Sequence, residues 1–193
     1  IYLFRNQGFS KFLILTGYKG EMIRDYFANG KKWGISIAYS HETIPLGTGG
    51  ALRNAKPLLE NNFLLVYGDS YLDINYLDMI LDFYKARCYI NLAVFQDKKK
   101  ETDVIPNILI DRKTHLVISY QKNAGRNYTH IDAGALVTSK KICQFLPLGV
   151  SSLENDLFPK MIQVKKMKVY EVSQRFYDIG TFERLKIFEG VMK

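Results

Sequence analysis

Cysteine, histidine and tryptophan are scarce in this chain, which has two Cys, three His and one Trp among 193 residues. Two cysteines cannot build a disulfide scaffold or a cysteine-rich metal cluster, and such usage is typical of a reducing compartment, so we expect a cytoplasmic protein. His41, His115 and His130 have no Cys or carboxylate partners at zinc spacing. No zinc site is therefore predicted, and His130 is expected at an exposed strand edge.

Long apolar runs are also missing. None approaches the roughly 20 residues needed to cross a bilayer, so no membrane partner is expected. The apolar start at Ile1–Phe4 has neither a charged leader nor a small-residue cleavage site, which predicts that there is no signal peptide. The 47% of apolar and 24% of charged residues are ordinary for a folded domain. The length suits a real core, and we expect a single domain over residues 1–193.

Basic residues exceed acidic ones by eight. Such a charge favours nucleic acid or small anions as ligands. The basic residues are dispersed, however, and the densest runs, Lys98–Lys100 and Lys165–Lys168, are short. Zinc-finger spacing, an RNP-like strand and basic heptads are all missing. We therefore expect phosphate-bearing small molecules and no nucleic acid.

Short apolar runs alternate with amphipathic stretches, which predicts an α/β fold with a mostly parallel, mixed sheet flanked by helices. Strands are predicted at 12–16, 35–39, 63–67, 90–95, 107–111, 116–121, 131–138 and 168–172. Helices are predicted at 19–30, 47–59, 76–86, 153–164 and 181–191.

Three segments place polar residues where open α/β sheets bind ligands, beyond the carboxyl ends of strands. LLVYGDSYLD puts Asp69 directly after a buried strand, as a Mg²⁺ ligand or as the cap of a turn. PLGTGGALRNA, residues 45–55, offers backbone N–H groups to a base, ribose or phosphate, or is a plain helix start. RFYDIGTFERL puts Asp178 before a helix starting near Thr181, again as a ligand or as part of a capped helix start.

In this order and spacing, the three segments resemble the sugar-1-phosphate nucleotidyltransferase family over essentially the whole chain. HIDAGALV is similar to the family's sugar-contacting strand, and SYQKN stands in the place of its Glu-Lys-Pro segment. The similarity is closest to the branch acting on mannose- or heptose-like 1-phosphates, often with guanine nucleotides. It implies a Rossmann-like nucleotidyltransferase fold and a Mg²⁺-dependent transferase of nucleotide-sugar and polysaccharide biosynthesis. The implied partners are a nucleoside triphosphate, with GTP favoured, and a sugar 1-phosphate.

The resemblance also implies roles for particular residues. Asp69 and Asp178 would bind Mg²⁺, and Lys122 would bind the sugar phosphate, which makes these three the catalytic residues. The nucleotide would be held by residues of the PLGTGGALRNA segment together with Glu42 and Gly68. The full set is Glu42, Leu46, Gly47, Thr48, Gly49, Gly50 and Gly68. The sugar would be contacted by four residues of the second half: Asn107, Gln121, Asp132 and Gly134.

The sequence departs from the family in two ways. Gln121 and Asp132 stand where many members have glutamate and asparagine. Family members begin with a strand and a separate glycine-rich loop, whose Arg and Lys hold the triphosphate. Neither that strand nor that loop has a match in this sequence. We therefore expect an N-terminally truncated domain, with the first strand and loop absent, that is inactive alone. The alternative is a non-catalytic regulatory domain of the same fold that binds nucleotide or sugar phosphate. The base, the sugar and any homo-oligomer stay open.

Overall fold

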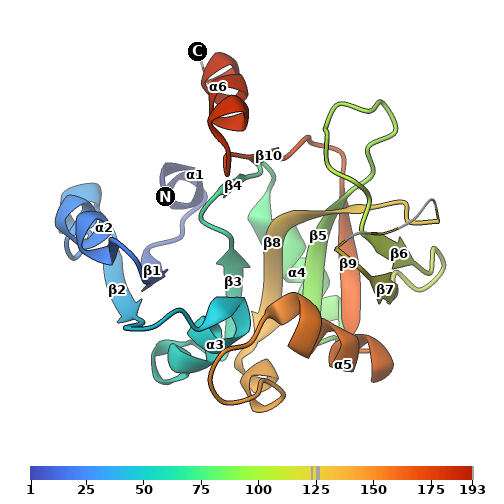
Figure 1. Cartoon of the computed structure of the whole chain (residues 1–193), viewed down its shortest axis with the longest axis horizontal. Coiled ribbons are helices and arrows are strands. Elements are labelled where there is room, and N and C mark those ends of the chain that lie inside the picture. Colours follow the sequence, from blue (N-terminus) through green and yellow to red (C-terminus); the bar gives the residue numbers. More distant parts are fainter. Residues whose placement is uncertain (123, 125–126, 193) are drawn as a thin grey trace. The chain divides into compact units, whose positions relative to one another are not determined.

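A computed structural model describes residues 1–122, 124 and 127–192. The chain divides into two compact units, Ile1–Phe63 with Ser139–Lys160, and Leu64–Thr138 with Met161–Lys193. Each unit is described by itself, with the element labels of Figure 1. The predicted single domain stays a prediction.

The first unit is built around two parallel strands. β1 (Lys11–Thr16) and β2 (Ser36–His41) pair along their whole length, and α2 (Gly20–Phe27) lies in the connection between them. This is the βαβ arrangement predicted for this stretch, because parallel neighbours need a crossover connection. The other elements of the unit are α1 (Tyr2–Asn6), η1 (Lys31–Trp33), α3 (Gly47–Asn54), η2 (Lys56–Leu58), η3 (Lys140–Gln144) and the π-helical turn η4 (Leu153–Leu157).

The second unit is built around a mixed sheet with the strand order β3-β8-β5-β9 (Figure 1). β5 (Ile90–Phe95) runs parallel to β9 (Met167–Val172) and antiparallel to β8 (Ile131–Ser139), while β3 (Asn62–Val66) begins in the first unit. All six residues of β5 are buried, because strands flank both its edges and α4 packs on it. The continuous apolar run at 90–95 is therefore the buried strand that it predicted.

Two short antiparallel pairs and two helices complete the second unit. β6 (Ile108–Ile110) pairs with β7 (Val117–Tyr120), and β4 (Ser70–Tyr71) pairs with β10 (Tyr177–Asp178). The helices are α4 (Tyr76–Ala86) and α6 (Phe182–Val191). The α/β class with a mixed sheet flanked by helices is confirmed. No helix among the described residues is both long enough and apolar enough to cross a bilayer.

Helix α4 shows how local sequence determines an element. The Asn75 side chain caps it by accepting the N–H of Leu77 at 3.1 Å. Buried side chains, including Met79 and Phe83, recur at three- and four-residue spacing and form the core face. Arg87 follows in a left-handed conformation with φ 50°, which ends the helix. The predicted bounds are therefore confirmed.

The predicted helix at 153–164 is wrong in its first turn. That turn is the π-helical η4, and α-helix begins only at α5 (Phe158–Gln163). Pro159 has no N–H, so the bond that a regular α-helix would make back to Asn155 cannot form. The helix predicted at 47–59 likewise ends at Asn54, and a 3-10 turn containing proline follows.

The predicted exposed position of His130 is wrong as well. His130 is 2% exposed, because the chain at this point enters the interior strand β8 rather than an edge strand. Its Nδ1 lies 2.8 Å from the Thr129 hydroxyl, and its Nε2 lies 3.5 Å from a carboxylate oxygen of Glu171. Burial lowers the pKa of His130 from its ordinary value, and Glu171 opposes that shift.

Candidate active site

Asp69 and Asp178 come together in the second unit at the β4–β10 pair. Asp69 lies in the exposed turn between β3 and β4, and Asp178 ends β10 opposite Ser70. The N–H of Ile179 donates to the Asp69 carbonyl at 2.8 Å. A Cβ placed on Gly180 would lie 2.9 Å from Asp178 Oδ1 and 3.8 Å from Asp69 Oδ2. The two carboxylates therefore lie beside the same glycine, and a shared Mg²⁺ stays a prediction.

Arg184 of α6 already neutralises Asp178. Its Nη1 lies 2.5 Å from Asp178 Oδ2, and its Nη2 lies 2.9 Å from Asp103 Oδ2. The other carboxylate oxygen of Asp178 accepts the Gly180 N–H at 2.7 Å. The hydrogen bond from Arg184 is the main reason that the pKa of Asp103 lies below its ordinary value. Sequence reasoning missed Arg184, because the contact depends on how α6 lies against the loop that carries Asp103.

The two carboxylates fit a magnesium site that a phosphate substrate would complete. Magnesium in phosphoryl-transfer sites is held by one or two carboxylates together with substrate phosphates and water. Within the described part of the chain, Asp69 and Asp178 belong to no cluster of three or more acidic, His or Cys side chains suited to a metal. The remaining ligands would therefore come from phosphate oxygens and water, and the cation would share the Asp178 carboxylate with Arg184.

The four residues predicted to contact a sugar lie together in the second unit. The Asn107 carbonyl accepts the Gln121 N–H at 2.9 Å, and Asn107 Oδ1 accepts the Asp132 N–H at 3.0 Å. Asp132 Oδ1 accepts the Gly134 N–H at 2.9 Å, and its Oδ2 accepts the Tyr120 hydroxyl at 3.1 Å. Sequence reasoning did not single out Tyr120, since no motif marks it.

Gly134 connects this network to the turn that carries Asp69. Its φ is +78°, and any side chain there would overlap the Ser70 hydroxyl, so only glycine fits. Its carbonyl accepts the Tyr67 N–H at 3.0 Å. The strand that carries Asp132 and Gly134 therefore lies beside the turn that carries the predicted metal ligand Asp69.

Lys122 and Gly68 are the remaining predicted residues of this unit. Lys122 is exposed in the turn after β7, and Gly68 is exposed in the turn before Asp69. A Cβ on Gly68 would meet no atom within 4 Å. Packing therefore does not require glycine at position 68, and both positions are accessible to a ligand.

The first unit has a pocket of about 60 Å³ at the carboxyl ends of β1 and β2. It is lined by Leu15, Thr16, Gly17, Ser40, Glu42, Ala51 and Asn54. Glu42 Oε2 accepts the Leu46 N–H at 3.2 Å, and a Cβ on Gly17 would lie 2.9 Å from Glu42 Oε1. An ionised carboxylate only accepts hydrogen bonds, so the pocket wall offers acceptors to a ligand with N–H donors.

The glycine-rich segment 47–50, which forms the first turn of α3, is shaped by residues 146–154 of the same unit. Gly49 and Gly50 are buried, and their N–H groups donate to the Ser151 carbonyl at 2.9 and 3.2 Å. A Cβ on Gly47 would lie 2.5 Å from that carbonyl. These glycines therefore permit close backbone packing. Contact between the loop and a nucleotide stays a prediction, and these two N–H groups are already engaged within the protein.

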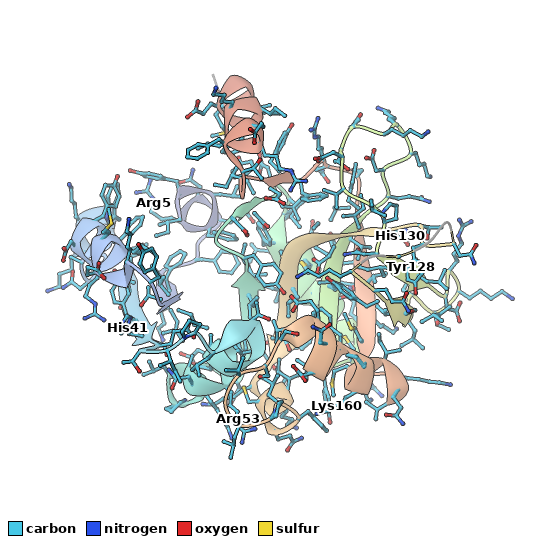
Figure 2. The ribbon with its side chains drawn as sticks, viewed as in Figure 1. Arg5, His41, Arg53, Tyr128, His130 and Lys160 are labelled. Atoms are coloured by element: carbon cyan, nitrogen blue, oxygen red, sulfur yellow. The ribbon has the colours of Figure 1, made fainter. Side chains whose placement is uncertain are left out.

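Residues 146–154 also hold Thr48 and the end of α3. The Thr48 hydroxyl donates to Glu154 Oε2 at 3.1 Å and accepts the Leu153 N–H at 2.9 Å. Arg53, labelled in Figure 2, donates to the Leu146 carbonyl. No sequence motif signals these contacts, because they join segments far apart along the chain.

A helix-flanked mixed sheet, with carboxylates after its strands and a glycine-rich helix start, defines a Rossmann-like α/β protein. Among solved structures, the chain is similar to HddC from Yersinia pseudotuberculosis, with a TM-score of 0.84 and 25% identity, covering 99% of this chain and 82% of that one. The nucleotidyl transferase family matches residues 1–188. The chain belongs to this family.

Named relatives agree with that membership. The chain is 31% identical over 176 residues to the D-glycero-alpha-D-manno-heptose 1-phosphate guanylyltransferase of Aneurinibacillus thermoaerophilus, covering 90% of this chain and 74% of that protein. It is 26% identical over 181 residues to the mannose-1-phosphate guanylyltransferase of Mycobacterium tuberculosis, covering 91% of this chain and 50% of that protein. The resemblance to sugar-1-phosphate nucleotidyltransferases is thereby confirmed.

Proposed function

We propose that this protein forms a nucleotide sugar and pyrophosphate from a nucleoside triphosphate, with GTP favoured, and a mannose- or heptose-like sugar 1-phosphate. Family membership and the names of two guanylyltransferase relatives support this reaction. The observation that carries the proposal is the placement of Asp69 and Asp178 beside Gly180, next to the strand with the predicted sugar contacts.

In this reaction an oxygen of the sugar 1-phosphate attacks the α-phosphorus of the triphosphate. The bond from the α-phosphorus to its bridging oxygen breaks, and pyrophosphate leaves. Both reactants are anions, so the protein must align them and neutralise charge. Asp69 and Asp178 would hold Mg²⁺, which supplies positive charge to the phosphate oxygens when bound. Lys122 would bind the sugar phosphate, and Asp132 would accept hydrogen bonds from sugar hydroxyls.

The Glu42 pocket supports guanine as the base. Guanine presents an N1–H and an exocyclic amine as adjacent donors, and a carboxylate offers only acceptors. Backbone contact with Leu46 holds the carboxylate in the pocket wall. Replacing Glu42 by Gln puts a donor in place of one acceptor, so we expect Glu42→Gln to reduce the preference for GTP over UTP.

The test measures pyrophosphate release by an N-terminally extended chain, from GTP and UTP with mannose 1-phosphate or a heptose 1-phosphate, in the presence of Mg²⁺. We expect Asp69→Asn and Asp178→Asn each to abolish release. Asp73→Asn removes the same charge from an exposed position nearby, and this variant should still release pyrophosphate. Equal release by all four proteins would refute the proposed roles of the two aspartates.

The regulatory alternative predicts ligand binding without release. The ion pair between Arg184 and Asp178 favours it, because a cation cannot use that oxygen of Asp178 while the pair persists. The expected need for an upstream glycine-rich loop stays a prediction as well. Comparing this chain with an N-terminally extended one tests both: release by the extended chain alone supports the need for the loop, and binding without release by either supports the alternative.

A further inference from the structure

The Asp132 carboxylate is held by donors from two different strands. The Gly134 N–H, two residues along β8, donates to Oδ1, and the Tyr120 hydroxyl at the end of β7 donates to Oδ2. The Asp132 backbone is fixed as well, because its own N–H donates to Asn107 Oδ1. All of these residues belong to the second unit.

The hairpin of β6 and β7 brings Tyr120 to this position. Tyr120 pairs with Ile108, the first residue of β6, and Ile108 also forms a bridge with His130, just before β8. The neighbouring Gln121 N–H donates to the Asn107 carbonyl. Backbone pairing on both sides of Ile108 therefore places Tyr120 close to the start of β8, where Asp132 lies.

We infer that Tyr120 is a positioning residue for sugar recognition, which acts by holding the Asp132 carboxylate toward the sugar hydroxyls. This inference rests on the proposed function, in which Asp132 contacts the sugar. A carboxylate fixed at both oxygens loses little rotational freedom when a hydroxyl donates to it, whereas a freely rotating one loses more. Removing the phenolic hydroxyl takes away one of the two side-chain restraints and leaves the backbone pairing of β7 intact.

The test compares the dissociation constants of GDP and GDP-mannose by calorimetry, because their ratio isolates the contribution of the sugar. We expect Tyr120→Phe to reduce the advantage of GDP-mannose over GDP by up to roughly fivefold, which corresponds to losing one Asp132–sugar hydrogen bond of about 1 kcal/mol. Its dissociation constant for GDP should stay within about twofold of the wild-type value, because the nucleotide contacts proposed for the loop and Glu42 are unchanged.

Tyr128→Phe is the matched control. It removes the same atom from a tyrosine of the following loop, labelled in Figure 2, whose hydroxyl lies 2.7 Å from Ser119 Oγ. We expect the wild-type ratio for this variant. In an Asp132→Ala background, Tyr120→Phe should have no further effect on the ratio, because a positioning residue acts only through the group that it holds.

Each result decides the matter. An unchanged ratio in Tyr120→Phe overturns the inference and leaves the proposed function standing. If Tyr120→Phe lowers the ratio as much in the Asp132→Ala background as in the wild type, Tyr120 touches the sugar itself, and the inference is overturned as well. If Tyr120→Phe does not fold, Asp132→Ala carries the test: an unchanged ratio in that variant overturns the inference, because the carboxylate that Tyr120 holds would then make no contact with the sugar. If the wild-type protein binds neither GDP nor GDP-mannose, the proposed function fails and the inference falls with it.

Discussion

Arg184 and Asp178 form an ion pair at 2.5 Å, six residues apart and on either side of the start of α6. The Thr181 side chain caps this helix by accepting the Arg184 N–H at 3.3 Å, so the capped helix start predicted from the sequence is confirmed. The arginine side chain reaches the end of β10, where it neutralises a predicted metal ligand. A cation bound by Asp69 and Asp178, as proposed, would therefore compete with Arg184 for the Asp178 carboxylate.

Replacing Arg184 should strengthen divalent cation binding. We expect Arg184→Met to bind Mn²⁺ roughly three- to tenfold more tightly, because a partly exposed ion pair worth about 1 kcal/mol no longer competes. Titration of Mn²⁺ by electron paramagnetic resonance measures the affinity directly. Lys186→Met, which removes the same charge from the same helix, is the control and should change it less. Weaker binding in Arg184→Met would mean that the arginine organises the site instead of competing for it.

Removing Lys122 should separate the two substrates. We expect Lys122→Ala to weaken sugar 1-phosphate binding by about 1.5–3 kcal/mol, the range for a charge-assisted hydrogen bond, and to leave nucleotide binding nearly unchanged. Separate calorimetric titrations give both affinities. Lys113→Ala changes an exposed lysine in the turn between β6 and β7 and serves as the control. Equal losses of both affinities would assign Lys122 a structural role.

A side chain at Gly134 should destabilise the second unit. We expect Gly134→Ala to lower the free energy of unfolding by at least about 1–3 kcal/mol, because alanine is strained at φ +78° and also overlaps Ser70. Urea denaturation measures the change. Gly190→Ala is the opposite case: Gly190 lies within α6 with open space around it, and alanine there should add about 0.5–1 kcal/mol. An unaffected Gly134→Ala would contradict the close approach to Ser70.

The buried His130 should make stability fall at mildly acidic pH. Its pKa in the folded protein lies below the ordinary 6.5, since burial disfavours the charged ring, Arg112 and Lys98 add to this, and Glu171 opposes it. Below about pH 6.5 the unfolded chain therefore binds a proton that the folded chain resists. The free energy of unfolding should decrease from pH 7 toward pH 5, by at most about 1.4 kcal/mol per pH unit from this group.

Urea titrations at pH 7, 6 and 5 test this dependence. His130→Asn should flatten the slope whatever its effect on stability at pH 7, because the titrating group is gone. A wild-type slope in His130→Asn would show that another group titrates.

Contiguous patterns predicted much of the fold. The apolar run at 90–95 became the buried strand β5, and the cap and spacing around Asn75 determined where α4 begins. Each of these depends on residues that are neighbours along the chain, and local preferences and burial agree there. Where local preference and the hydrophobic pattern disagree, as at Pro159 of α5, the helix bounds predicted from the pattern were wrong.

Local sequence placed Asp69 after β3, Asp178 at the end of β10, and three glycines in the first turn of α3. What these residues contact follows from tertiary packing. The pairing of β4 with β10 brought Asp69 beside Asp178, Ser151 took the N–H groups of the loop glycines, and Tyr120 reached Asp132. The physical reason is that helix and strand periodicity is written in neighbouring residues, whereas these contacts join segments whose proximity depends on how the whole chain packs.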